Sequence, residues 1–230
     1  MRLQVFLSSS GVASRRSAVD IIKSGRVRVN NSLVFEPSHR VIPEKDKVYF
    51  DDRRVFPKEK IYIILHKPKR VTTTKKDKFA EKTVMDLLPR RFRYLNPVGR
   101  LDKDTTGLLL LTNDGGVINR FTHPKFKVDK IYVVHLNRKL AVSDKLRLEE
   151  GVSLDGRRTA GCRIHLGPGK TLKITIHEGR KRQIRRIFAK AGYSVKGLKR
   201  LKEGMLTLGS LPEGTWRFLT KEEKLYIALD

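Results

Sequence analysis

The sequence predicts an α+β fold in which a small amino-terminal module precedes a larger domain of strands and helices. The chain has 230 residues, enough for one sizeable domain and a small one, and hydrophobic residues make up 39% of it, which suffices for a packed core. The first 55 residues contain two short helical patterns followed by strand patterns, and later segments alternate between strand-like and helical spacing. We therefore expect domains at residues 1–55 and 60–230, with a charged linker over residues 51–60 that contains Pro57.

The charge balance is strongly basic. Lysine and arginine number 51 against 24 acidic residues, a formal net charge of +27. Such an excess indicates a polyanionic partner, with a cationic membrane-surface protein as the alternative. No stretch is long and apolar enough to span a bilayer, and the start lacks the apolar core of a signal peptide, so we expect no membrane partner. Cys162 is the only cysteine, which excludes an intrachain disulfide and fits a reducing, cytoplasmic setting.

The amino-terminal module is predicted from local spacing. Leu3, Phe6 and Leu7 have helical spacing, and Ser14 can cap a second helix. A hairpin is expected around Asn30-Asn31. Five cations cluster at the second helix and the turn that follows: Arg15, Arg16, Lys23, Arg26 and Arg28. They form either an ordinary solvated face or a surface that binds phosphates and fixes position on RNA without reading bases.

A charged loop precedes the most apolar segment of the chain. Residues 99–107 read GRLDKDTTG, and four leucines then lead to a turn of Asn, Asp and Gly. Consecutive leucines bounded by turn signals predict a strand buried on both faces. That strand would hold Arg100, Asp102 and Asp104 on a rigid support, as a catalytic site requires. The alternative is a charged loop that merely precedes a core strand.

Several further elements follow from the pattern. A strand over 61–65 should end at His66 to Lys69, because Pro68 cannot continue a central strand. Residues 72–82 are polar and lysine-rich, which predicts a mobile loop. Residues 130–136 predict a strand with Tyr132 on its apolar face.

Later in the chain, Ser143 is expected to cap a helix that ends at Gly151. Residues 172–176 predict another strand, and residues 184–191 a helix that Gly192 ends. The cations Arg182, Arg185 and Arg186 lie at the start of this helix, where they oppose the macrodipole. This small unfavourable term suggests that they have a use.

Five stretches carry a resemblance to a known family. The segment GRLDKDTTGLLLLTNDG resembles the catalytic motif of the RsuA family of bacterial ribosomal RNA pseudouridine synthases, and EGRKRQIRRIF resembles a second family motif. GVASRRSA and IKSGRVRVN resemble its S4-like RNA-binding module, and residues 198–217 match the closing motif in order. Two positions depart from the pattern. His66 stands where the family usually has Asn, and Glu203 stands where we expect an apolar residue.

The resemblance implies a mixed, mainly antiparallel β-sheet domain with flanking helices behind the S4-like domain. It makes Asp102 the catalytic carboxylate and Arg185 the cation that pairs with it. Tyr132 would lie against the target base and stack on it or move a proton. Further RNA-binding residues are expected at Arg100, Arg180, Arg182 and Arg186, in addition to the five amino-terminal cations.

The implied reaction is the isomerisation of a specific uridine in ribosomal RNA to pseudouridine. It involves no redox change or hydrolysis, so we expect no cofactor and no metal, and the sequence has neither a glycine-rich phosphate loop nor paired Cys/His ligands. The substrate would be a stem-loop whose target uridine is flipped out. Whether Asp102 attacks the sugar or the ring is open, as is whether free RNA or a pre-ribosomal particle is bound. The second motif favours large-subunit over small-subunit RNA, and a monomer is the default expectation.

Two alternatives compete with this hypothesis. A non-catalytic S4-domain ribosome-assembly factor would have the same charge, but it would not need Asp102, Tyr132 and Arg185 together. A glycoside hydrolase using Asp102 and Asp104 is disfavoured, because the two lie on one loop and such enzymes need carboxylates that flank the bond.

Overall fold

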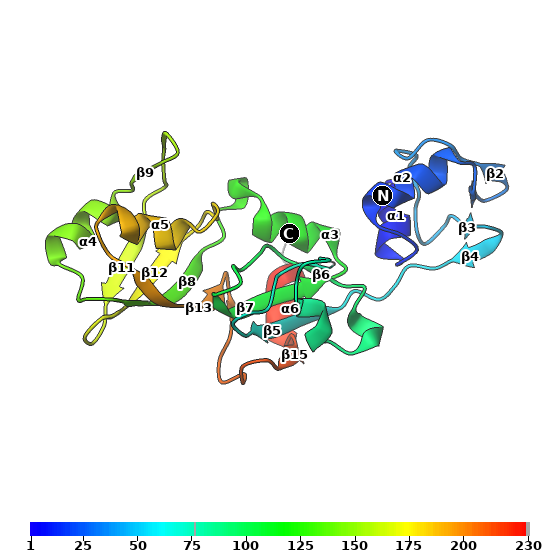
Figure 1. The fold of residues 1–230 in the computed structure, drawn as a ribbon. Coiled ribbons are helices and arrows are strands. Elements are labelled where there is room, and N and C mark those ends of the chain that lie inside the picture. Colours follow the sequence, from blue (N-terminus) through cyan, green and yellow to red (C-terminus); the bar gives the residue numbers. More distant parts are fainter. Residues whose placement is uncertain (76, 229–230) are drawn as a thin grey trace. The chain divides into compact units, whose positions relative to one another are not determined.

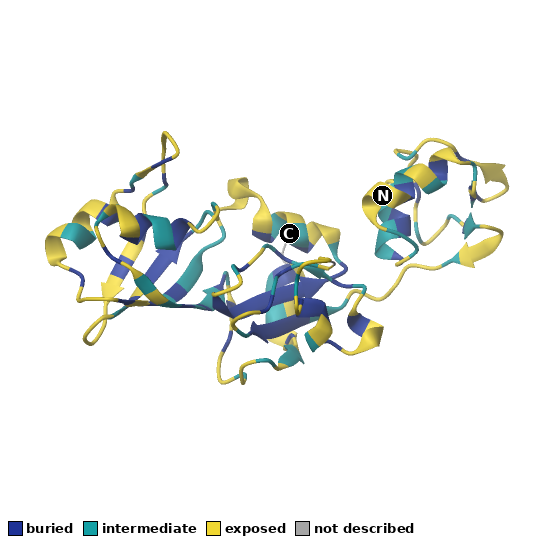
Figure 2. Ribbon diagram, in the orientation of Figure 1, coloured by how far each residue is buried: buried dark blue, intermediate teal, exposed yellow. Residues whose placement is uncertain are grey.

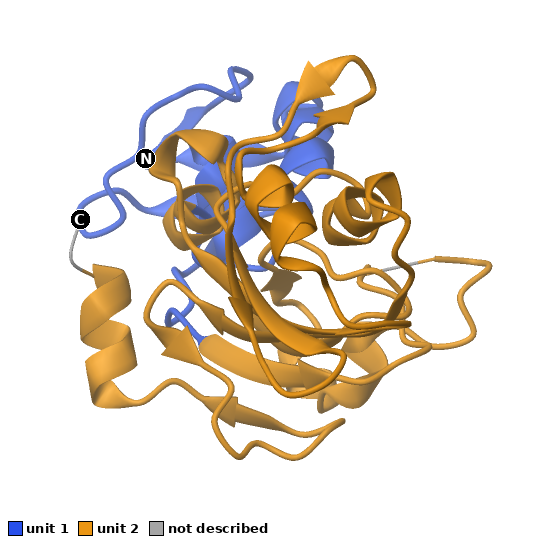
Figure 3. Ribbon diagram, turned by 90° about the vertical axis from the view of Figure 1, so that its left-hand side faces the viewer, with its two compact units in different colours: residues 1–61, 113–115 blue, residues 62–112, 116–230 orange. Residues whose placement is uncertain are grey.

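The computed structural model describes residues 1–75 and 77–228, and it divides into two compact units (Figure 3). The first comprises Met1–Ile61 and Asn113–Gly115, and the second comprises Tyr62–Thr112 and Gly116–Asp230. Among the described residues, no helix has the length and apolar character needed to cross a membrane.

The first unit packs two helices on a four-stranded antiparallel sheet of order β2-β1-β3-β4 (Figure 1). Its elements are α1 (Leu3–Ser9), α2 (Arg15–Lys23), β1 (Val27–Val29), β2 (Ser32–Leu33), β3 (Val48–Phe50) and β4 (Arg53–Val55). The predicted cap of the second helix is confirmed, since the Ser14 hydroxyl accepts a hydrogen bond from the Ser17 amide at 3.1 Å. The predicted hairpin is also confirmed, with Asn30 in the left-handed region at φ 55°.

Strand β4 lies inside the segment that was predicted to be a linker. Asp51 and Asp52 have φ of 45° and 59°, and this turn pairs β4 with β3. Aspartate tolerates the left-handed conformation that two-residue hairpin turns need. The charge of Arg53 and Arg54 misled the prediction, because an exposed edge strand accepts charged side chains.

The second unit is built on one mixed sheet of order β11-β12-β8-β13-β7-β5-β15, with β14 paired to β13 and β6 to β7. Only the β13–β7 pair is parallel. Its strands are β5 (Tyr62–Lys67), β6 (Asn96–Pro97), β7 (Thr106–Thr112), β8 (Lys130–Leu136), β11 (Arg163–Leu166), β12 (Thr171–Ile176), β13 (Val195–Glu203), β14 (Leu206–Thr207) and β15 (Trp216–Phe218); a separate hairpin joins β9 (Ser153–Leu154) to β10 (Arg157–Arg158). The helices are η1 (Val84–Leu87), η2 (Arg90–Phe92), α3 (Gly115–Thr122), η3 (Pro124–Phe126), α4 (Val142–Glu149), α5 (Gln183–Lys190) and α6 (Lys221–Ala228).

Strand β7 carries the catalytic-motif leucines through the middle of this sheet. All seven of its residues are buried, which confirms the strand predicted from the leucine run (Figure 2). Gly107 begins the leucine run with φ 110°, and a Cβ atom there would overlap the backbone of Arg200 on β13. The loop that contains Asp102 is therefore followed at once by a closely packed strand pair.

Two predictions in this unit need correction. Strand β5 continues through His66 to Lys67 and stops only at Pro68. Helix α4 has Ala141 at its N-cap, so Ser143 lies inside the first turn and does not cap it.

Residues 72–82, predicted to be a mobile loop, start with a buried anchor. The Thr73 hydroxyl donates to the Leu101 carbonyl at 2.8 Å, which ties this segment to the catalytic loop. Lys76 of the segment lies outside the described residues.

Candidate active site

A cleft of about 490 Å³ lies in the second unit, beside the loop that precedes β7. Asp102 and Tyr132 both line it, together with three of the predicted RNA-binding arginines: Arg100, Arg180 and Arg182. Arg185 and Arg186 are absent from its lining, and the five amino-terminal cations belong to the other unit. The cleft thus brings together one carboxylate, one aromatic ring and several cations.

The Asp102 side chain is half-buried on a loop whose backbone is well held. Its own carbonyl accepts from the Thr105 amide at 3.0 Å, and the neighbouring Leu101 exchanges two hydrogen bonds with Thr73. Within the described part of the chain, no hydrogen bond or ion pair engages the Asp102 carboxylate. The carboxylate is therefore fixed through its backbone and available to a substrate.

Lys67 also supports the loop that contains Asp102, and the sequence analysis did not predict this role. Its side chain is fully buried, and its ammonium donates to the carbonyls of Pro68, Lys103 and Thr105 at 2.8, 3.2 and 3.0 Å. Burial lowers the pKa of Lys67 to about 8, while the carboxylates of the catalytic loop oppose this shift. The signal in the sequence was a lysine at the end of an apolar strand, where we predicted only a stop.

Tyr132 projects from β8 and is almost fully buried. Burial raises the pKa of its hydroxyl, and the nearby Arg200 guanidinium opposes this rise. Arg200 Nε donates to the Leu108 carbonyl at 2.7 Å. Arg200, which lies on β13 between the two strands, therefore links the tyrosine of β8 to the backbone of β7.

The Glu203 carboxylate compensates the positive charge that is buried beside Tyr132. Its carboxylate lies 3.3 Å from Arg200 and 4.0 Å from the Lys130 ammonium, and both Arg200 and Glu203 are about 2% exposed or less. Burial raises the pKa of Glu203, against the attraction of these two cations. The acid at this position, where an apolar residue was expected, is thus a partner for buried cations.

The loop before α5 is organised by its own polar residues. The Gln183 side chain accepts from the Arg180 amide at 2.9 Å and donates to Glu178, whose carboxylate also accepts from the Ala160 amide at 3.1 Å. The Arg180 guanidinium donates to the carbonyls of Arg157 and Arg158 at 2.9 and 2.7 Å. Arg180 therefore anchors the β9–β10 hairpin while lining the cleft.

Arg185 lies against the catalytic loop but makes no ion pair with Asp102 in the described chain. Its guanidinium donates to the carbonyls of Val195 and Asp104 at 2.9 and 3.2 Å. Burial lowers the pKa of Arg185, and Asp102 and Asp104 counter this by attraction. Arg186, on the same helix, pairs with Asp155 at 2.5 Å.

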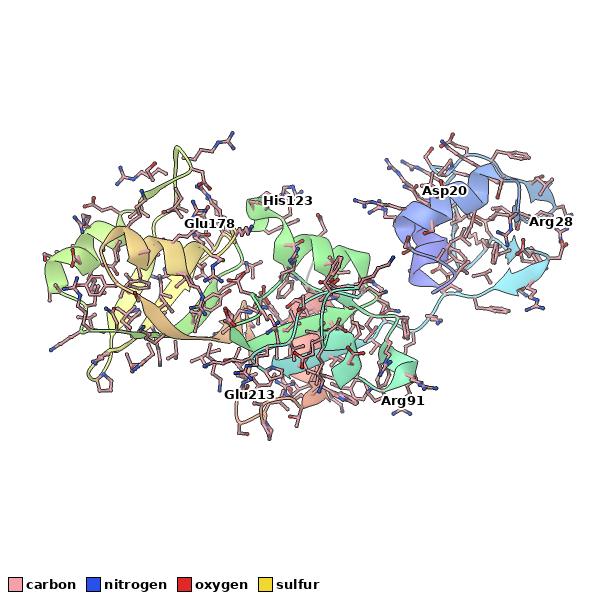
Figure 4. All side chains as sticks on the ribbon, in the orientation of Figure 1. Asp20, Arg28, Arg91, His123, Glu178 and Glu213 are labelled. Atoms are coloured by element: carbon pink, nitrogen blue, oxygen red, sulfur yellow. The ribbon has the colours of Figure 1, made fainter. Side chains whose placement is uncertain are left out.

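The five amino-terminal cations differ in whether they pair with a carboxylate. Arg15, Arg16 and Lys23 are exposed. Arg26 pairs with Asp51, and Arg28, labelled in Figure 4, pairs with Asp52 at 2.9 Å. Phosphate attraction is therefore expected mainly from the first three.

Comparisons with known proteins identify the family of this chain. Residues 61–190 match the RNA pseudouridylate synthase family, and residues 1–46 match the S4 domain. The chain is 38% identical over 229 residues to the ribosomal large subunit pseudouridine synthase B of Bacillus subtilis, covering 96% of this chain and 93% of that protein. An uncharacterized RNA pseudouridine synthase of Aquifex aeolicus is 39% identical, with 97% and 92% covered. A crystal structure of a pseudouridylate synthase superposes with a TM-score of 0.73 at 32% identity and covers 99% of each chain.

The fold and the cleft define an RNA-modifying enzyme with a separate RNA-binding module. The chain belongs to the RNA pseudouridylate synthase family, of the RsuA type that its motifs indicated. The predicted α+β class, with an S4 domain before a mixed-sheet synthase domain, is confirmed.

Proposed function

We propose that this protein isomerises a specific uridine in ribosomal RNA, with large-subunit RNA favoured over small-subunit RNA, and that Asp102 is the catalytic carboxylate. The observation that carries the proposal is the presence of Asp102 and Tyr132 in one cationic cleft. The relative in Bacillus subtilis, named for the large ribosomal subunit, supports the choice of RNA.

The chemistry is a balanced rearrangement. The bond between uracil N1 and ribose C1′ breaks, the base turns, and C5 bonds to C1′; the proton on C5 is then lost while N1 gains one. Asp102 acts as the nucleophile at the sugar or the ring, and the bond that its carboxylate forms there breaks again before pseudouridine is released. Arg185, held on the Asp104 carbonyl, favours the ionised carboxylate by attraction. Tyr132 supports the uracil ring, with its hydroxyl near the Arg200 guanidinium.

The target uridine must leave its stack before it can reach this cleft, at a cost of roughly a few kcal/mol. Phosphate contacts from Arg100 and Arg182 and from exposed cations of the S4 module offset this cost. The substrate is a stem-loop of ribosomal RNA, free or in a pre-ribosomal particle, in the cytoplasm. One chain carries every proposed residue, so a monomer is sufficient.

Complementation tests the proposal. A strain that lacks the gene receives the wild type, Asp102→Asn or Asp104→Asn, and pseudouridines are mapped across both ribosomal RNAs. Asp104 is the matched control, because its side chain is exposed and absent from the cleft lining. We expect one large-subunit pseudouridine to return with the wild type and Asp104→Asn, and a loss of at least about a thousandfold in rate with Asp102→Asn. Restoration by Asp102→Asn would contradict the assignment of Asp102 as the catalytic carboxylate, and an absence of the pseudouridine with the wild type would leave only an RNA-binding role.

A further inference from the structure

A second cavity of about 480 Å³ adjoins the catalytic cleft. The two share four wall residues: Arg100, Tyr132, Gly179 and Arg180. The second cavity extends from this wall towards the end of α3, where Thr122 and His123 line it. Figure 4 labels His123 and Glu178, which line this cavity and not the first. Each cavity is large enough for about one nucleotide.

The lining suits a nucleic-acid base. Pro124 and Val128 supply apolar surface, and Lys130 and Arg100 supply positive charge. RNA-binding proteins recognise unstacked bases by this combination of flat apolar contact and polar groups at the base edge. The positive charge matches the phosphates on either side of such a base.

Two buried charged side chains contribute polar groups to the same lining. Arg200 and Glu203 both belong to it, and both are at least nine-tenths buried. Arg200 Nη2 and Glu203 Oε2 form an ion pair at 3.3 Å, but within the described residues neither atom has a partner in hydrogen-bond geometry.

We infer that this second cavity receives the base of the nucleotide next to the target uridine. The inference rests on the proposed function, because a uracil placed against Tyr132 fixes where the RNA strand leaves the cleft. Tyr132 and Arg100 belong to the wall that both cavities share. The nucleotide joined to the target uridine through its phosphate therefore enters the second cavity as the strand leaves the catalytic cleft. The cavity would then help to select which uridine is modified.

A pair of tryptophan variants isolates the cavity. Thr122 is exposed, ends α3, and lines the second cavity only, so Thr122→Trp fills the space without replacing any residue of the shared wall. Asn119 is exposed on the same helix and lines neither cavity, so Asn119→Trp is the matched control. Neither change removes a buried group, and thermal melting checks that both variants fold.

Binding is measured with a synthetic stem-loop, chosen by ultraviolet crosslinking of the protein to ribosomal RNA. Each loop nucleotide is replaced in turn by an abasic residue. For the wild type and Asn119→Trp, we expect one abasic position, directly beside the crosslinked uridine, to weaken binding about tenfold, as loss of one stacked base does. Thr122→Trp should weaken binding to the intact RNA by a similar factor and should show no further loss at that position.

The inference would be overturned if the abasic residue weakened binding to Thr122→Trp by a further factor of about ten. It would also be overturned if Thr122→Trp bound the intact RNA as tightly as Asn119→Trp does. The readout is affinity, so it does not depend on isomerisation. Failure of the proposed function would appear separately, as an absence of pseudouridine with the wild type while the binding coupling is still measured.

Discussion

The two units of the protein use cations in opposite ways. In the S4 unit, Arg15 and Arg16 are exposed, and Arg26 meets a carboxylate at the surface. In the synthase unit, Lys67 and Arg200 are buried and donate to backbone carbonyls around the catalytic loop and β7. The net charge of +27 therefore includes two kinds of cation. One attracts RNA, and the other holds the geometry of the site.

The physical cost of each arrangement differs. An exposed cation keeps its water, so removing it changes stability little. A buried cation has lost its water and relies on every partner it has. The comparison is therefore tested by removing a group of each kind.

The largest effect is expected for Glu203→Gln. The substitution keeps the shape but removes the charge that compensates Arg200 and Lys130, and breaking such a buried pair costs about 3–5 kcal/mol in the free energy of unfolding. Urea unfolding measures it. Glu150→Gln is the control, because Glu150 forms an exposed pair with Arg158 at 3.7 Å; its loss should be about 0.5 kcal/mol or less. Equal losses in the two variants would contradict the distinction.

Lys67→Met should destabilise the protein by about 2–4 kcal/mol, because the Thr105 carbonyl loses its buried donor and the Lys103 carbonyl keeps only the Arg70 amide. The change has a defined pH dependence. Burial lowers the pKa of Lys67 to about 8 in the folded chain, so above pH 8 the unfolded chain binds more protons and wild-type stability rises with pH.

The stability gap between the wild type and Lys67→Met should therefore be constant below about pH 7 and widen from pH 8 towards pH 10, as followed by urea unfolding at each pH. Lys69→Met, at an exposed neighbouring position, should show neither the loss nor the widening. A gap that narrowed above pH 8 would contradict the burial of a charged Lys67.

The smallest effect on stability is expected for the double variant Arg15→Ala and Arg16→Ala, at about 0.5 kcal/mol or less. Its effect should appear in RNA binding, where the slope of log affinity against log salt falls by about 1.4–1.8 if both cations contact phosphates. Arg26→Ala with Arg28→Ala should change the slope less, because Asp51 and Asp52 already neutralise these residues. Equal slope changes in the two double variants would show that the ion pairs of Arg26 and Arg28 break when RNA binds.

The parts of the fold that were predicted correctly have local signals. The leucine run gave β7, Ser14 gave the start of α2, and the apolar spacing gave α5. Strand β4 was missed because its charge resembles that of a linker, and the start of α4 was misplaced because a serine near a helix start need not be its cap.

The supports of the site depend on contacts between residues that are far apart in the sequence. Lys67 reaches the carbonyl of Lys103, 36 residues away, and Arg200 reaches that of Leu108, 92 residues away. No spacing rule detects such contacts. The motif resemblance could indicate Asp102 and Tyr132, but only the folded sheet shows what holds them.

Gly107 limits the evolutionary freedom of the catalytic motif. Because the backbone of Arg200 occupies the place of its side chain, the residue is excluded from variation by geometry and not by any part in the reaction. In a saturation library, function at this codon should survive only as glycine, whereas the exposed Lys103 and Asp104 nearby tolerate many replacements. A position in a catalytic motif can thus be restricted to one residue type by the contact between two strands.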